Sequence, residues 1–97
     1  MAAYVIAQLE VTDPVAYERY RAAAPPTIAA AGGRYLARGG EITALEGRHD
    51  GRRVVLLEFP TVEAARAWYD GEAYRLARDL RAHSARNVTF LLLPGLP

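Results

Sequence analysis

The chain has 97 residues, of which 52% are hydrophobic and 24% charged, so it is long enough for one domain with a single core, residues 1–97. Its formal net charge of +1 argues against nucleic-acid binding, because no strong positive field would attract phosphate groups. Cysteine and lysine are both absent, which excludes thiolate chemistry, iron–sulfur clusters and Schiff-base catalysis.

The N-terminal part of the chain predicts a strand followed by a helix. Apolar residues alternate over 4–11, which is the period of a strand. Asp13 then offers a side chain that can cap a helix, and Pro14 suits the first helical turn. The Pro25-Pro26 pair is expected to break or bend this helix before a short turn over 27–31.

The middle of the chain predicts two strands joined by a turn. Residues 34–45 have an extended pattern, interrupted by Gly39-Gly40, where a bulge or a close approach of another backbone is expected. Residues 47–51 contain Asp-Gly, a short-range hairpin signal. Residues 53–59 then form an apolar run typical of a strand.

The C-terminal part repeats the order helix, then strand. Thr61 is a candidate helix cap, and apolar residues recur at helical spacing over 62–69 and again over 72–83. The last strand is expected over 87–93. The order βαββαβ predicts an α+β, ferredoxin-like fold in which a four-stranded antiparallel sheet carries its helices on one face.

Two of the predicted strands, 53–59 and 87–93, are apolar on both faces. A sheet with helices on one side would then expose an apolar second face, which soluble monomers rarely tolerate. We therefore expect a homodimer that packs through the open sheet face. No apolar stretch approaches the roughly 20 residues that cross a bilayer, and the N-terminus lacks a signal pattern, so the expected location is the cytoplasm.

Aromatic and charged residues suggest a small-molecule pocket between the helices and the sheet. Arg38 is expected to hold an anionic group of a ligand. Glu58 interrupts an apolar strand, where a buried carboxylate is costly unless it pairs with an arginine, a water or a ligand. Glu58 and Tyr69 are therefore the candidate catalytic proton carriers. The other expected ligand-binding residues are aromatic: Tyr17, Tyr20 and Trp68. Alternatively, the aromatic residues form an ordinary core and Glu58 makes a structural pair with Arg38.

The two histidines do not support a metal site. His49 falls in the predicted turn and His83 at the end of the last helix, where a cation is favoured by the helix dipole. We expect neither a metal nor a cofactor, and we assign no role to either histidine.

Several short motifs together resemble the family of uncharacterised proteins called domain of unknown function thirteen-thirty, within the dimeric α/β-barrel superfamily. The motifs span nearly the whole chain: Asp13-Pro14 with Tyr17 and Tyr20, the run from Gly32 to Gly40, Leu45-Glu46-Gly47, Glu58-Phe59-Pro60, and Ala67-Trp68-Tyr69 followed by Tyr74. The sequence departs from the family in carrying arginine where relatives often have lysine, and Asp70-Gly71 where a serine often follows the Trp-Tyr pair.

The resemblance implies a dimeric ferredoxin-like fold with a cleft between helices and sheet, but it implies no established activity. The wider superfamily includes cofactor-free monooxygenases, lactone isomerases and haem enzymes, and nothing in this sequence marks a porphyrin pocket. One hypothesis is a cofactor-independent, isomerase-like or monooxygenase-like enzyme for a small organic acid, phenolic or lactone-like metabolite. The alternative is a non-catalytic small-ligand-binding or stress-related dimer.

Overall fold

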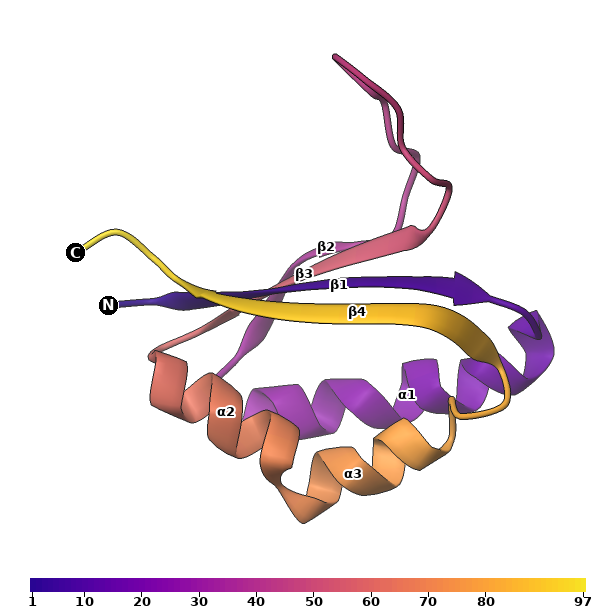
Figure 1. Cartoon of the computed structure of the whole chain (residues 1–97). Coiled ribbons are helices and arrows are strands. Elements are labelled where there is room, and N and C mark those ends of the chain that lie inside the picture. The colour runs from indigo at the N-terminus through magenta and orange to yellow at the C-terminus, as the bar shows by residue number, and fades with distance from the viewer.

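Four antiparallel strands form one sheet, and three helices cover one of its faces (Figure 1). The computed structural model describes all residues, Met1–Pro97. The elements follow in the order β1 (Ala3–Val11), α1 (Pro14–Ala30), β2 (Arg34–Arg38), β3 (Arg53–Phe59), α2 (Val62–Asp70), α3 (Glu72–Asp79) and β4 (Ala85–Pro94). In the strand order β2-β3-β1-β4, the N-terminal strand β1 lies beside the C-terminal strand β4. This topology confirms the predicted α+β ferredoxin-like fold.

Strand periodicity builds the core between the sheet and the helices. In β1 every second side chain is buried beneath the helices, whereas the side chains between them face the other way. Leu57 and Phe59 of β3 join the same layer. The helices contribute most of the remaining buried side chains: Tyr17, Tyr20, Ala24, Ile28, Ala65, Trp68, Tyr74 and Ala77.

Helix α1 begins as its sequence predicts, because Asp13 Oδ1 accepts a hydrogen bond from the backbone N–H of Ala16 at 3.1 Å. The expected break at Pro25-Pro26 is wrong: the helix continues through both prolines to Ala30. The burial of Ala24 and Ile28 against the sheet stabilises this part of the helix. Each proline nevertheless leaves one carbonyl of the preceding turn without its helical donor.

The second half begins with the predicted cap, since Thr61 Oγ1 accepts a hydrogen bond from the N–H of Ala64 at 3.0 Å. Gly71 separates α2 from α3. Helix α3 ends at Asp79, four residues before the predicted end, and turns over 80–84 bring the chain back to β4. No helix of the protein has both the length and the apolar character needed to span a bilayer.

The prediction of a strand over 34–45 is wrong beyond Arg38. Gly39 and Gly40 have φ angles of +75° and +103°, which end the extended backbone of β2. Residues 39–52, called the arm below, contain no strand. The expected antiparallel pairing of the two strands is present between β2 and β3, but it ends at Arg38 and does not continue to a tight turn at 47–51. In Figure 1 the arm rises from the sheet on the side opposite the helices.

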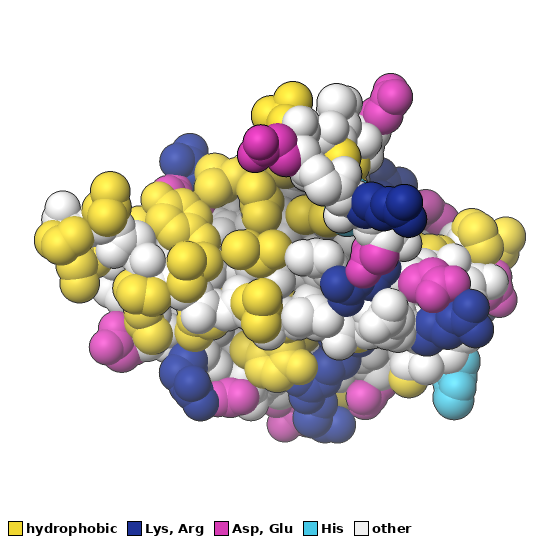
Figure 2. Space-filling model, turned by 45° about the horizontal axis from the view of Figure 1, so that its top comes forward, with side chains coloured by type: hydrophobic (Ala, Val, Ile, Leu, Met, Phe, Trp, Pro, Cys, Tyr) yellow, Lys and Arg dark blue, Asp and Glu magenta, His cyan; other side chains and the backbone are white.

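The face of the sheet opposite the helices, called the open face below, is apolar at one end and polar at the other. Its apolar side chains come from three strands: Tyr4, Ile6, Val54, Leu56, Leu91 and Leu93. Leu91 and Leu93 are 52% and 44% exposed. Figure 2 shows hydrophobic side chains gathered on one side of this face and charged side chains on the other. The polar end holds Arg52, which donates hydrogen bonds to Gln8 and Thr89.

Candidate functional site

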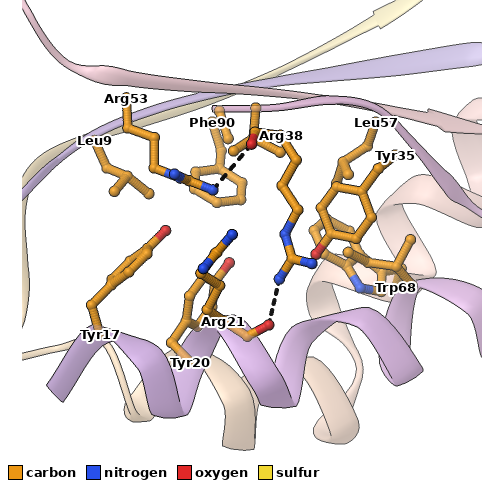
Figure 3. Close-up of a pocket in the computed structure, with 13 residues that line it drawn as sticks. Leu9, Tyr17, Tyr20, Arg21, Tyr35, Arg38, Arg53, Leu57, Trp68 and Phe90 are labelled. Atoms are coloured by element: carbon orange, nitrogen blue, oxygen red, sulfur yellow. Dashed lines mark hydrogen bonds between the residues drawn. The ribbon is translucent and has the colours of Figure 1, made fainter. Parts of the chain in front are cut away.

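A cleft lies between α1 and the helix-covered face of the sheet (Figure 3). Ten of its thirteen lining residues are hydrophobic, and the lining consists of Ala7, Leu9, Tyr17, Tyr20, Arg21, Ile28, Tyr35, Arg38, Arg53, Val55, Leu57, Trp68 and Phe90. The enclosed space measures about 20 Å³. Since one water needs about 10–15 Å³ of such space, the cleft holds a water or the small polar head of a ligand.

Three guanidinium groups point into this cleft, from Arg21 of α1, Arg38 of β2 and Arg53 of β3 (Figure 3). Arg21 forms an ion pair with Glu18 at 3.2 Å on the exposed surface. Arg38 and Arg53 have no carboxylate within ion-pair distance, and no acidic residue lines the cleft. Arg38 and Arg53 therefore bring positive charge to the cleft that no side chain of the protein neutralises.

A β-bulge in β2 is what turns Arg38 toward the cleft. Tyr35 pairs with Leu57, but the register then shifts, so that Arg38, and not Ala37, pairs with Val55. Paired residues share a face of the sheet, and Leu57 and Val55 face the helices. In an unbroken strand Arg38 would face the opposite side, because side chains alternate.

Two contacts fix the side chain of Arg38. Its guanidinium carbon lies 4.6 Å from the ring centre of Tyr35, a cation–π arrangement. Its Nη2 also donates a hydrogen bond to the backbone carbonyl of Arg21, as the dashed line in Figure 3 shows. Arg38 is thus held between β2 and α1 with further N–H donors free for a ligand.

Arg53 occupies the other side of the cleft. Its Nη2 donates to the carbonyl of Arg38 at 3.4 Å, and its Nε is buried without a hydrogen-bond partner. A β-carbon on Gly39 would lie 2.4 Å from Nη1 of Arg53, so only glycine leaves room for this guanidinium. The expected bulge or close backbone approach at Gly39-Gly40 is wrong: a side chain approaches Gly39, nothing lies within 4 Å of Gly40, and the bulge falls earlier, between Tyr35 and Ala37.

A fourth arginine, Arg81, lies behind the aromatic residues. It is 8% exposed, and its guanidinium lies 5.5 Å from the ring centre of Tyr20 and 5.0 Å from that of Phe90. Its Nε is buried without a partner, and no carboxylate pairs with it. Buried arginines normally pair with acids, so Arg81 adds to the positive charge beside the cleft.

The tyrosines around the cleft provide hydroxyl groups. Tyr20 and Tyr74 share a hydrogen bond of 2.7 Å, in which either hydroxyl can donate. Burial raises the pKa of Tyr17, of Tyr20 and of Tyr35 above the ordinary value of 10.0. These phenols therefore stay protonated at neutral pH and can donate hydrogen bonds to an anion.

The structure brings together four of the predicted site residues. Tyr17, Tyr20, Arg38 and Trp68 all line the cleft. Trp68 is fixed there by a hydrogen bond from its Nε1 to Thr27 Oγ1 at 3.1 Å and by ring contacts with its neighbours. This grouping connects α1, β2 and α2, which are far apart in the sequence.

The expected grouping of Glu58 with Arg38 in one cleft is wrong. Glu58 pairs with Tyr4 across the β1–β3 ladder and therefore lies on the open face. Its carboxylate accepts a hydrogen bond from Nε of Arg34 at 2.8 Å, and the pKa of Glu58 falls below its usual value because of Arg34 and Tyr4. The alternative ion pair with Arg38 is wrong for the same reason.

Tyr69 also lies outside the cleft. It stacks edge-on against Trp68 at 6.0 Å between ring centres, and Arg78 lies 4.7 Å above its ring. It lines a separate groove between α2 and β4, together with Asp70 and Val88. The two expected proton carriers, Tyr69 and Glu58, are therefore on different sides of the molecule.

Sequence reasoning missed Arg53, Arg81 and Tyr35. The alternation of β3 contained the signal for Arg53, because Val55 and Leu57, two and four positions later, are the residues that face the helices. Arg81 follows the buried Ala77 by four positions, the spacing of one helix face. Assigning Tyr35 and Arg38 to the same face of β2 requires the position of the bulge between them, and no residue pattern marks that position.

A wider groove of about 510 Å³ adjoins the cleft beneath the arm. Leu9 and Arg53 line both spaces. Polar residues of the arm and of β1 also line the groove, among them Glu10, His49 and Arg52.

The fold and the cleft define a ferredoxin-like α+β protein with a cationic, aromatic cleft between its helices and its sheet. The chain belongs to the family described as domain of unknown function (DUF1330), whose model matches residues 2–96. No protein with a curated description matches the sequence.

Solved structures similar to this chain share its fold. A protein of unknown function from Rhodopseudomonas palustris has a TM-score of 0.78 at 20% identity, over 99% of this chain and 83% of that chain. A dimeric ferredoxin-like protein of unknown function from Thermobifida fusca YX has a TM-score of 0.68 at 19% identity, over 96% and 90%. A protein named as a candidate antibiotic biosynthesis monooxygenase from Nitrosomonas europaea has a TM-score of 0.61 at 16% identity, over 97% and 90%. At these identities the likeness shows the fold alone.

Proposed function

We propose that this protein binds a small organic acid, with the carboxylate of the ligand in the cleft. The observation that carries the proposal is that Arg21, Arg38 and Arg53 converge on one space that no acidic side chain lines. Guanidinium groups bind carboxylates through paired hydrogen bonds, and a buried positive charge without a partner favours an anion.

The surrounding groups suit an anionic head on an apolar or aromatic body. The protonated hydroxyls of Tyr17 and Tyr35 can donate to a carboxylate, and Trp68 and Phe90 offer apolar surface. The enclosed volume of about 20 Å³ suits only the head, so the body would extend toward the groove beneath the arm. The ligand class that fits is a small aromatic or aliphatic monocarboxylate.

A cofactor-independent enzyme, isomerase-like or monooxygenase-like, is the second candidate. The observation that favours it is the hydroxyl pair of Tyr20 and Tyr74, which could donate a hydrogen bond to negative charge that develops on an oxygen of a bound acid. The cleft lacks a carboxylate or imidazole that would accept a proton, so binding is the better-supported role. A catalytic task for Glu58 or Tyr69 would require a ligand that extends beyond the cleft.

The same proposal includes a homodimer formed through the open face. The apolar side chains of three strands lie exposed there, and two copies packed sheet to sheet would remove them from water. The similar protein from Thermobifida fusca YX is described as dimeric. The cleft lies on the helix side of the sheet and would remain accessible in such a dimer.

Titration with benzoate, followed by amide chemical shifts, tests the binding proposal. Benzoate should shift the signals of residues that line the cleft, whereas benzamide, which is similar in shape but uncharged, should not. Arg53→Gln should weaken benzoate binding about tenfold or more. Arg48→Gln, an exposed arginine of the arm, is the matched control and should bind benzoate as the unmodified protein does. Equal shifts with benzamide, or equal affinity in Arg53→Gln, would contradict the proposal.

The enzyme candidate has a separate test. Phenylpyruvate in deuterated water exchanges its C3 protons through an enol, and the exchange can be followed by proton NMR. A catalyst should accelerate this exchange above the buffer rate, and Tyr20→Phe should reduce the acceleration. A rate equal to that of buffer would leave binding as the only supported role.

A further inference from the structure

The two prolines inside α1 free two backbone carbonyls, and a side chain of β2 donates to one of them. In an α-helix the N–H of each residue donates to the carbonyl four positions earlier. Pro25 has no N–H, so the carbonyl of Arg21 has no helical donor, and Pro26 frees the carbonyl of Ala22 in the same way. The carbonyl of Arg21 is the one that Arg38 reaches.

The freed carbonyl supplies one of the two contacts that fix Arg38. Without it, the guanidinium would be held only by the ring of Tyr35, at 4.6 Å. With it, the side chain is fixed from β2 and from α1 at once (Figure 3). A binding group that is already immobilised loses less conformational freedom when the ligand arrives, so affinity rises.

We infer that Pro25 is a positioning residue for the anion-binding cleft: by withholding its helical hydrogen bond, it gives Arg38 a fixed acceptor on α1. The inference rests on the proposed function for its effect on binding, but the contact itself can be tested without a ligand. Pro26 lies next to Pro25 in the same helix and frees a different carbonyl, that of Ala22, so it provides the control, although Pro26 is exposed and Pro25 is half-buried.

Replacing either proline by alanine should make helix α1 more stable. Alanine at position 25 or 26 restores an N–H donor and is a better helix former. Pro25→Ala should therefore keep or raise the thermal midpoint while it weakens benzoate binding, because its new N–H competes with Arg38 for the carbonyl of Arg21. A merely structural role would change stability and affinity in the same direction.

The binding experiment compares benzoate affinity in the unmodified protein, Pro25→Ala and Pro26→Ala. Pro25→Ala should bind about three- to tenfold more weakly. Pro26→Ala should stay within about twofold of the unmodified protein, because the carbonyl that it frees is not the acceptor of Arg38. Equal affinities of the unmodified protein and Pro25→Ala would overturn the inference and leave the proposed function intact.

A double-mutant cycle tests the contact in the absence of a ligand. Arg38→Met should lower the urea midpoint more in the unmodified protein than in the Pro25→Ala background. The hydrogen bond to the carbonyl of Arg21 is present, and can be lost, only in the unmodified protein. The same cycle with Pro26→Ala should show no coupling. Equal losses in the unmodified and Pro25→Ala backgrounds would overturn the inference. If the unmodified protein did not bind benzoate, the proposed function would fail, and the cycle alone would decide whether Pro25 fixes Arg38.

Discussion

The hydroxyls of Tyr20 and Tyr74 lie 2.7 Å apart in the core, although 54 positions separate the two residues in the chain. This bond joins α1 to α3. Tyr20→Phe should lower the free energy of unfolding by about 1–3 kcal/mol, because it leaves the buried hydroxyl of Tyr74 without this partner. Urea unfolding of the variant measures the loss. The variant with both residues replaced by phenylalanine should recover part of it, and a further loss in the double variant would contradict this account.

Alkaline pH should reveal the buried phenols. Burial raises the pKa of Tyr17 and of Tyr20 above 10.0, so the folded protein holds these protons more tightly than the unfolded chain does. Their contribution to stability is therefore complete below pH 10 and is lost as the pH rises above it. Ultraviolet absorbance of phenolate, read beside circular dichroism, should show the buried tyrosines ionising together with unfolding. Full ionisation of all six tyrosines in a folded protein would disprove the prediction.

Acid pH should abolish the contribution of Glu58 to the stability of the folded protein. Hydrogen bonds from Arg34 and Tyr4 lower the pKa of Glu58 below 4.5, so its stabilising effect is present above that value and disappears as the pH falls through the lowered pKa. Glu58→Gln should be less stable than the unmodified protein at pH 7, and the difference should shrink toward acid pH. Thermal midpoints of the two proteins across this range measure it. A difference independent of pH would indicate that the charge of Glu58 does not contribute.

Two neighbouring glycines separate backbone strain from side-chain crowding. Alanine at Gly40, where φ is +103° and nothing lies within 4 Å, should cost of the order of 1–3 kcal/mol through strain alone. Gly39→Ala has similar strain and also displaces the flexible end of Arg53, so it should cost a similar amount of stability but should weaken benzoate binding. Urea unfolding and benzoate titration of both variants provide the comparison. Unchanged benzoate affinity in Gly39→Ala would show that Arg53 does not hold the anion.

A charge on the open face should separate the proposed dimer. Leu91→Glu places a carboxylate among the apolar side chains that a partner would cover, and light scattering at micromolar concentration should then report the mass of a monomer. Leu76→Glu is the matched control, because Leu76 is similarly exposed, 55% against 52% for Leu91, but lies on α3. A monomeric unmodified protein would exclude the dimer.

Local signals predicted the fold well. Alternation predicted β1, an apolar run predicted β3, and the side chains of Asp13 and Thr61 cap α1 and α2 as expected. The sequence failed where distant contacts outweigh local preference. Pro25-Pro26 should end a helix in isolation, but burial of the turns around them against the sheet keeps α1 continuous.

The site was predicted in part, for a geometric reason. Aromatic residues on helices can be assigned to the core by spacing, and Tyr17, Tyr20 and Trp68 do line the cleft. A strand that is apolar on both faces, such as β3, does not show which of its faces meets the helices. Glu58 was placed on the wrong face for this reason, and Arg53 was not recognised although it lines the cleft.

The bulge in β2 decides on which side of the sheet a cation lies. Deleting Leu36 would remove the extra residue, and Ala37 and Arg38 would keep their partners Leu56 and Val55. Arg38 would then lie two positions after Tyr35 in a regular strand and would still face the cleft. A straightened strand of unchanged length would instead pair Arg38 with Val54, so that the cleft would lose a cation and the surface proposed to meet a second copy would gain one. This strand can therefore lose a residue at the bulge without moving charge across the sheet, a tolerance usually associated with loops such as the arm.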